Sequence, residues 1–176
     1  ATIADLGRVR RDSLVEDPFC GSGTLLIEAA QKAMNIAPGL KRRFAAERYS
    51  FVPAAIWAQQ RQKALAESKL DVGFEAFGYD IDPAAVALAN ANAKLAGVGD
   101  RCRFEVADVK DFAPRPSSII LTNPPYGERL GDAAEAAGVL ADQGCPEPAA
   151  RILDFTLSHI PEGQYFIVHA YRPDGT

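Results

Sequence analysis

Short apolar runs alternate with helical patterns along this chain. Strands are expected where apolar and β-branched residues cluster, and helices where apolar residues recur at intervals of three and four. The expected strands cover residues 14–19, 74–80, 103–107, 118–122 and 164–171. The expected helices cover residues 24–33, 54–69, 83–96 and 149–160. This alternation predicts an α/β fold with a mainly parallel sheet.

Local residues refine the boundaries of these elements. Asp82 is expected to cap a helix that has Pro83 in its first position, and Gly97 is expected to end it. Residues 35–72, which include the break at Pro38-Gly39, are expected to form a helix-containing insertion. Five strands separated by helices predict a Rossmann-like sheet. The sequence stops soon after the last strand, so we expect a single domain over residues 1–176 with its sheet truncated there.

Composition and charge exclude several classes of protein. The chain has 176 residues, 48% of them hydrophobic, and a net charge of −4, which excludes a disordered or strongly basic nucleic-acid-binding arm. Three scattered cysteines predict neither a disulfide framework nor a zinc site, and His159 and His169 lack ligand partners at useful spacing. No apolar run is long enough to span a bilayer and no signal peptide opens the chain. We therefore expect a cytoplasmic protein without a metal ion and without membrane association.

Two motifs at strand ends predict a nucleoside site. The first is Asp17-Pro18-Phe19-Cys20-Gly21-Ser22-Gly23-Thr24, where glycines let the backbone approach a ligand at the start of a helix. A strand–helix turn without a ligand explains it nearly as well. The second is Asp80, which can accept hydrogen bonds from ribose hydroxyls at the end of the second strand. Asp80 lies much further from Gly23 than the ~20 residues of a dinucleotide motif, which disfavours NAD.

Two further motifs add the chemistry of an aromatic amine. Asp108, after the third strand, can accept a hydrogen bond from an adenine amino group, although a solvated carboxylate is an equal alternative. The fourth strand ends in Asn123-Pro124-Pro125-Tyr126. The Asn amide oxygen and a proline carbonyl can accept both hydrogens of an exocyclic amine, and Tyr126 can stack on the base. Such positioning directs the nitrogen lone pair at an electrophile. Standing alone, the motif would be interpreted as a proline turn with a packed tyrosine.

Together, these motifs resemble those of class I S-adenosylmethionine (SAM)-dependent methyltransferases. The chain looks most similar to the RNA methylase family of bacterial 23S rRNA guanine-N2 methyltransferases, which often carry a THUMP domain. The resemblance rests on DPFCGSGTLLIEAA (17–30), APGL (37–40), Phe51, Trp57, GYDIDPAAVALANANAKLAG (78–97), the Asp108 segment and TNPPYGERLG (122–131). It covers most of residues 14–131, with no THUMP domain in this sequence, and residues 132–148 match the family poorly.

The resemblance implies a role for each motif. Asp17, Cys20, Gly21 and Gly23 would border the methionine part of SAM. Asp80 would hold the ribose, Ile81 would pack on adenine and Asp108 would contact its amino group. Asn123, Pro124, Pro125 and Tyr126 would form the catalytic motif that binds the target amine, with Asn123 also next to the cofactor.

Three hypotheses for the function follow. The first is an RNA methyltransferase acting on guanine N2 of rRNA, and the second is a DNA adenine-N6 methyltransferase with the same core. The third is a SAM-binding fragment without catalysis.

The insertion is expected to form part of the substrate wall. Phe51 and Trp57 are interpreted as core residues, and the basic residues of the insertion, together with Arg129, as candidate phosphate contacts whose alternative is a solvated surface. The basic residues are Lys41, Arg42, Arg43, Arg48, Arg61 and Lys63.

Overall fold

A twisted, mainly parallel sheet forms the centre of the part of the chain that the structure describes. The computed structural model describes residues 2–123 and 169–171. The strands are β1 (Leu14–Asp17), β2 (Glu75–Asp80), β3 (Cys102–Val106), β4 (Ile119–Thr122) and β5 (His169–Tyr171), in the order β3-β2-β1-β4-β5. The first four are parallel, whereas β5 pairs antiparallel with β4. The predicted α/β class and the mainly parallel sheet are confirmed.

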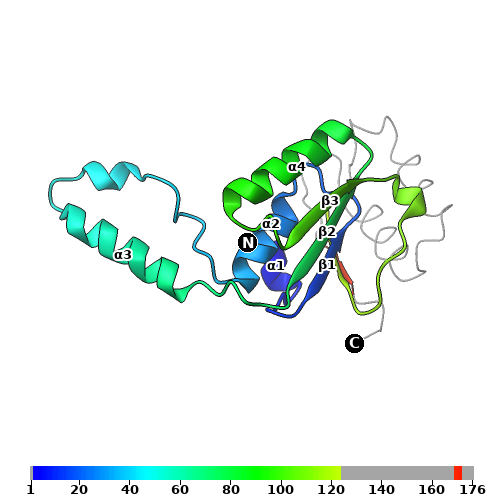
Figure 1. The fold of residues 1–176 in the computed structure, drawn as a ribbon, viewed down its shortest axis with the longest axis horizontal. Helices are drawn as coiled ribbons and strands as arrows, with labels where there is room; N and C mark the ends of the chain where they lie inside the picture. The colour runs from blue at the N-terminus through cyan, green and yellow to red at the C-terminus, as the bar shows by residue number, and fades with distance from the viewer. Residues whose placement is uncertain (1, 124–168, 172–176) are drawn as a thin grey trace, which may run out of the picture.

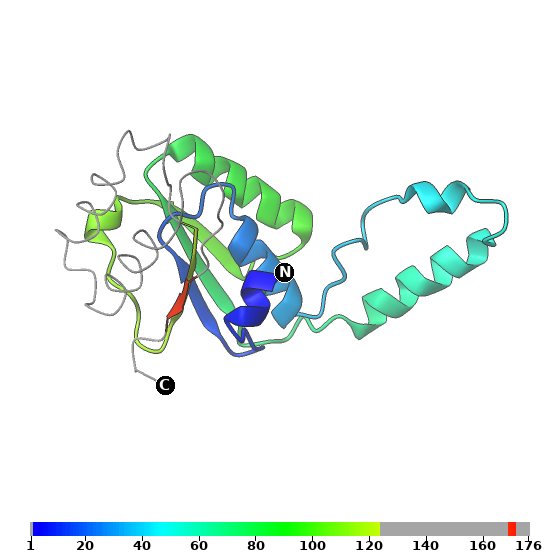
Figure 2. The same cartoon turned by 180° about the vertical axis from the view of Figure 1, so that it is seen from behind.

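Three helices cover one face of the sheet. They are α1 (Thr2–Leu6), α2 (Thr24–Ala33) and α4 (Pro83–Ala96), with α1 packed on α2 and α2 packed on α4 (Figures 1 and 2). Strand β2 lies beside β1, and β3 lies beside β2 on the side away from β1. The two crossovers, through α2 and through α4, therefore run in the same direction across the sheet. Because such crossovers are right-handed, both helices lie on the same face. α1 has no counterpart among the expected helices. The expected helix over 149–160 and the start of the last strand lie outside the described residues.

Small side chains let α2 and α4 approach the sheet closely. The buried positions of α2 include Ala29, Ala30 and Ala33, and those of α4 include Ala89 and Ala93. They meet larger buried residues of the strands and loops. Those residues are Val15, Phe74, Val98, Phe104, Ile119 and Leu121. The core therefore combines alanines of the two helices with larger residues of the strands and loops, and Leu26 of α2 is fully buried among them.

The predicted ends of α4 are confirmed. The Asp82 carboxylate accepts a hydrogen bond from the backbone N–H of Ala84 at 2.8 Å, and Pro83 is the first residue of the helix. Gly97 ends the helix at a φ of 80°, in the left-handed region that glycine adopts without strain. Asp82 is thereby a structural cap, as the sequence pattern indicates.

The insertion forms an arm that projects from the domain. We use "the arm" for residues 35–72, which contain the short 3-10 helix η1 (Ala45–Arg48) and the helix α3 (Ala54–Glu67). Neither helix has a buried residue. Because the arm lies between the end of α2 and the start of β2, it joins the domain at the amino ends of the parallel strands (Figures 1 and 2).

This placement corrects two expectations. The arm does not line the carboxyl ends of the strands, so it is not a wall of the crevice there. Phe51 is 79% exposed and is not a core residue. Trp57 also lies outside the core and instead stacks on Phe44 within the arm, with ring centroids 6.1 Å apart. Among the described residues, no helix is long and apolar enough to cross a bilayer.

Candidate functional site

The loop between β1 and α2 is held against the end of β2 by backbone hydrogen bonds. The N–H of Cys20 donates to the carbonyl of Tyr79 at 2.8 Å, and the N–H of Gly23 donates to the carbonyl of Cys20 at 2.8 Å. Gly21 and Gly23 have φ values of 51° and 79°, which favour glycine. Apart from its two chain neighbours, no described residue has an atom within 4 Å of where a Cβ of Gly21 would be, so this part of the chain leaves open space beside the backbone there. The loop can therefore admit a ligand next to its amide groups.

Asp80 connects this loop to the start of α4. One carboxylate oxygen accepts the N–H of Gly21 at 2.9 Å, and the other accepts the N–H of Asp82 at 2.9 Å. Its neighbour Ile81 is 68% exposed, which leaves an apolar surface beside the carboxylate. The structure thus brings the predicted ribose-binding and adenine-packing residues next to the glycine loop. Their roles toward a ligand remain predictions.

Asp17 is a buried carboxyl group at the end of β1. It is 1% exposed, and burial raises its pKa from 3.8 to about 7, with a smaller contribution from the negative charge of Asp80. A hydrogen bond from the backbone N–H of Phe19, at 3.0 Å, opposes this rise in pKa. A carboxyl group whose pKa is shifted this strongly toward neutral pH is a recurrent feature of functional sites. A cationic ligand beside it would favour the ionised form.

The ends of β3 and β4 bring the remaining predicted residues to the same edge. Asp108 is half-buried and follows Ala107, whose N–H donates to the carbonyl of Asp80 at 3.1 Å. Asn123 follows β4, and its amide oxygen Oδ1 is buried without a hydrogen-bond partner among the described residues. A buried acceptor of this kind is costly unless a ligand or water satisfies it. Pro124, Pro125, Tyr126 and Arg129 lie outside the described residues.

Burial limits the chemistry of Cys20, in the glycine loop, and of Cys102, at the start of β3. Burial raises the pKa of the Cys20 thiol to about 12, and the charges of Asp17 and Asp80 raise it further. Burial also raises the pKa of Cys102 to about 12. Neither thiol is therefore available as a thiolate nucleophile near neutral pH. Within residues 2–123 and 169–171, no cluster of His, Cys, Asp and Glu is arranged to hold a metal ion.

Comparison with known proteins places this chain in a family. The UPF0020 model, described as the RMKL-like methyltransferase domain, matches residues 1–143. The chain belongs to this family. A curated relative, the ribosomal RNA large subunit methyltransferase K/L of Shewanella baltica strain OS195, is 48% identical over 128 residues. That match covers 70% of this chain and 18% of the relative, so the chain spans about a fifth of the length of such relatives.

Solved structures of methyltransferases support the fold of this UPF0020 domain. The structure of SMU.472 complexed with SAH has a TM-score of 0.69 and 33% identity, covering 81% of this chain and 41% of that chain. A structure described as a "predicted N6-adenine-specific DNA methylase" from Listeria monocytogenes has a TM-score of 0.73 and 37% identity. It covers 81% of this chain and 39% of the other. The fold is thus Rossmann-like, and SAM is the cofactor of the family.

The residues of the UPF0020 site fit SAM. The open space at Gly21 leaves room for the cofactor beside backbone amides, and Asp80 and Ile81 offer an acceptor and an apolar surface for a nucleoside. Asp17 supplies a carboxyl group next to the loop, suited to the positive charge of SAM. The carboxyl ends of the strands therefore present charge, acceptors and apolar surface in the combination that this cofactor requires.

Sequence reasoning missed two features that support the site. A Cβ at Gly78 would lie 2.5 Å from the Phe104 ring and 2.9 Å from the Cβ of Cys20, so only glycine fits where β2 passes under the loop. A glycine inside a strand was the available signal. The second feature is the fully buried Glu16, which pairs with Arg115 across 99 positions of sequence and had no local signal.

Proposed function

We propose that this chain is the methyltransferase domain of a cytoplasmic RNA-modifying enzyme that methylates an exocyclic base amine, with guanine N2 of 23S rRNA as the target. The observation that carries the proposal is the buried Oδ1 of Asn123, which has no hydrogen-bond partner among the described residues and lies at the edge that also holds the glycine loop and Asp80. An amine N–H would satisfy this acceptor. The rRNA methyltransferase name of the Shewanella relative supports an RNA substrate.

The proposed roles rest on the sequence motifs and, for Asp17, Asp80 and Asn123, on their placement at the carboxyl ends of the strands. Bound SAM would supply an electrophilic methyl group on a sulfonium; transfer to the amine nitrogen would form an N–CH3 bond, break the S–CH3 bond, leave S-adenosylhomocysteine and pass one amine proton to water. Asp80 binds the nucleoside end of the cofactor, and Asp17 offsets its positive charge. Asn123 accepts one amine hydrogen and directs the nitrogen lone pair along the line of transfer, a contribution of positioning. Pro124, Pro125 and Tyr126 complete the amine site, and a base in structured RNA is splayed out to reach it.

The substrate is tested by offering two nucleic acids to the same preparation. The chain is incubated with SAM and unmodified 23S rRNA, with plasmid DNA in parallel, and methylated nucleosides are identified by mass spectrometry. We expect N2-methylguanosine from RNA. N6-methyladenine from DNA would support the second candidate, which the description of the Listeria structure favours. Absence of any product, with SAM binding retained, would support the non-catalytic alternative.

The role of Asn123 is tested by two substitutions. Asn123→Ala removes the acceptor, and we expect SAM affinity to be retained while transfer falls by about a hundredfold. Asn123→Asp keeps an acceptor oxygen in the same place and is expected to retain more activity than the alanine variant. Equal activity of the alanine variant and the unaltered chain would refute the assignment, as would loss of SAM binding.

A further inference from the structure

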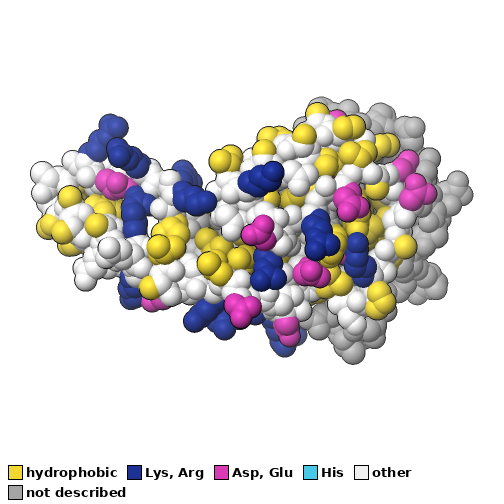
Figure 3. All heavy atoms as spheres, in the orientation of Figure 1, with side chains coloured by type: hydrophobic (Ala, Val, Ile, Leu, Met, Phe, Trp, Pro, Cys, Tyr) yellow, Lys and Arg dark blue, Asp and Glu magenta, His cyan; other side chains and the backbone are white. Residues whose placement is uncertain are grey.

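The arm has the opposite charge to the rest of the chain. Residues 35–72 contain seven Lys or Arg and three Asp or Glu, a net charge of +4. The remaining residues contain 12 Lys or Arg and 20 Asp or Glu, a net charge of −8. In Figure 3, dark blue side chains lie over both the arm and the domain, whereas magenta side chains lie mainly over the domain. The segment that projects from the domain is therefore also the one that attracts a polyanion.

Arg61 is the arginine of the arm whose side chain makes hydrogen bonds within the arm, whereas Arg43 acts on Glu47 through its charge alone. The Arg61 guanidinium donates to the carbonyls of Gly39 at 3.3 Å and Leu40 at 2.9 Å and forms an ion pair with Glu47. It also lies 5.8 Å from the centre of the Phe44 ring. Glu47 in turn accepts the N–H of Phe44 at 2.9 Å, and this hydrogen bond and Arg61 lower its pKa. Arg61 is thus a structural residue of the arm, which corrects its interpretation as a phosphate contact.

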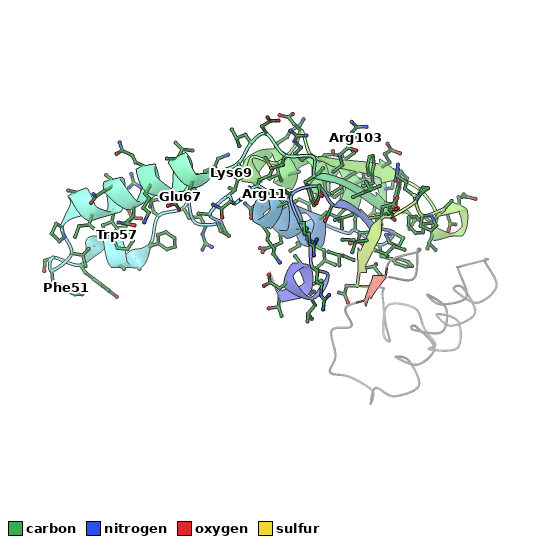
Figure 4. The ribbon with its side chains drawn as sticks, turned by 90° about the horizontal axis from the view of Figure 1, so that it is seen from below. Arg11, Phe51, Trp57, Glu67, Lys69 and Arg103 are labelled. Atoms are coloured by element: carbon green, nitrogen blue, oxygen red, sulfur yellow. The ribbon has the colours of Figure 1, made fainter. Side chains whose placement is uncertain are left out.

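Exposed aromatic rings and guanidinium groups lie along residues 42–51 of the arm, before the start of α3. Tyr49 and Phe51 stack with their centroids 5.4 Å apart, yet they are 52% and 79% exposed. Phe51 lies at the far end of the arm in Figure 4. Arg42, Arg43 and Arg48 are exposed, and none forms an ion pair with another described residue. We call these five residues the arm tip.

We propose that the arm tip is a second RNA-contact site, separate from the crevice at the carboxyl ends of the strands. Its rings would stack on unpaired bases, and its arginines would contact phosphates. Exposed aromatics combined with positive charge suit single-stranded nucleic acid, because stacking accepts every base and phosphates supply most of the affinity. A protein partner is less favoured, since an apolar interface core is depleted in charge. The inference rests on the proposed function, because it presumes an RNA substrate.

The position of the arm predicts which step it affects. The arm joins the domain at the amino ends of the strands, whereas Asp17, Asp80 and Asn123 lie at the carboxyl ends. Contacts at the arm tip therefore hold the RNA away from the methylated base. They contribute to RNA affinity and to KM, and they leave SAM binding and the transfer step unchanged.

Charge-matched variants test the electrostatic part. The double variant R42Q/R43Q removes two positive charges from the arm tip, and R10Q/R11Q removes two from an exposed loop of the domain. RNA affinity is measured by filter binding to an unmodified 23S rRNA fragment at several salt concentrations. We expect the salt slope to fall by about 0.7 to 0.9 for each phosphate that R42Q/R43Q no longer neutralises. The slope of R10Q/R11Q is expected to match that of the unaltered chain.

Variants of Phe51 test the stacking part. Phe51→Ala and Phe51→Leu both remove the ring, and both are expected to weaken RNA binding about fivefold or more. Rescue by leucine would indicate an apolar protein contact and overturn the proposal, as would a change in oligomeric state without a change in RNA affinity. SAM affinity by calorimetry is the control for folding and is expected to be unchanged.

The two proposals fail in distinguishable ways. If the unaltered chain methylates RNA while all arm-tip variants keep its RNA affinity and KM, only the arm proposal is refuted. If the unaltered chain methylates DNA alone, the proposed RNA function is refuted, and so is the proposal that the arm tip contacts an RNA substrate. An unaltered chain that binds no RNA overturns both proposals.

Discussion

Asp17 provides a direct test of the site without any substrate. Its carboxyl is buried beside Asp80, and burial raises its pKa to about 7 from 3.8. Between these pH values the folded chain holds a proton on Asp17 that the unfolded chain has released. The free energy of unfolding contributed by this group therefore falls as pH rises from about 4 to about 7. Asp17→Asn removes the titratable group, so the free energy of unfolding of this variant should not show this decline with pH.

The magnitude follows from the difference between the two pKa values. Each pKa unit corresponds to about 1.36 kcal/mol, so the unaltered chain loses up to about 4 kcal/mol relative to Asp17→Asn across this pH range. With a urea dependence of about 2 kcal/mol per M, the difference in unfolding midpoint should grow by about 2 M. The measurement is urea unfolding followed by far-UV circular dichroism at pH 4 to 8, in the absence of SAM.

Asp12→Asn is the matched control, since it neutralises an exposed carboxyl group of the domain. The difference in urea unfolding midpoint between Asp12→Asn and the unaltered chain should change little over the same pH range. If the difference between Asp17→Asn and the unaltered chain stayed constant from pH 4 to 8, the argument from burial would be wrong. A difference that grew toward low pH would mean that Asp17 is stabilised as a carboxylate.

Two further predictions concern the packing beneath the loop and the buried ion pair of β1. Gly78→Ala places a Cβ 2.5 Å from the Phe104 ring and should cost about 1–3 kcal/mol in urea unfolding, whereas Gly73→Ala, whose Cβ would meet nothing closer than 3.8 Å, should cost much less. Equal losses would refute the steric argument. Arg115→Met leaves Glu16 buried without its guanidinium partner and should cost about 3–5 kcal/mol. Adding Glu16→Gln should restore much of that stability, and a purely additive double variant would contradict the pairing.

Local sequence determined the elements and the edge at which the site lies. Asp82, Pro83 and Gly97 fix both ends of α4 because caps act through contacts within a few residues. Gly21 and Gly23, which follow β1, likewise set the conformation of their loop through local backbone geometry. Since the carboxyl ends of parallel strands share one edge of a sheet, Asp80 and Asn123 could be placed near one another without coordinates.

Tertiary structure alone decided the properties that depend on distant partners. The pKa of Asp17 depends on its burial beside Asp80, and the need for glycine at position 78 depends on Phe104 from a neighbouring strand. The antiparallel direction of β5 had no local signal either.

The arm shows the same division. Its helix was expected from the pattern of residues, but that pattern does not say where an insertion points. Phe51 was therefore assigned to the core, whereas the fold leaves it exposed at the outer end of the arm. Spacing along a chain specifies local conformation, while burial, charge environment and orientation arise only when segments far apart in sequence pack together.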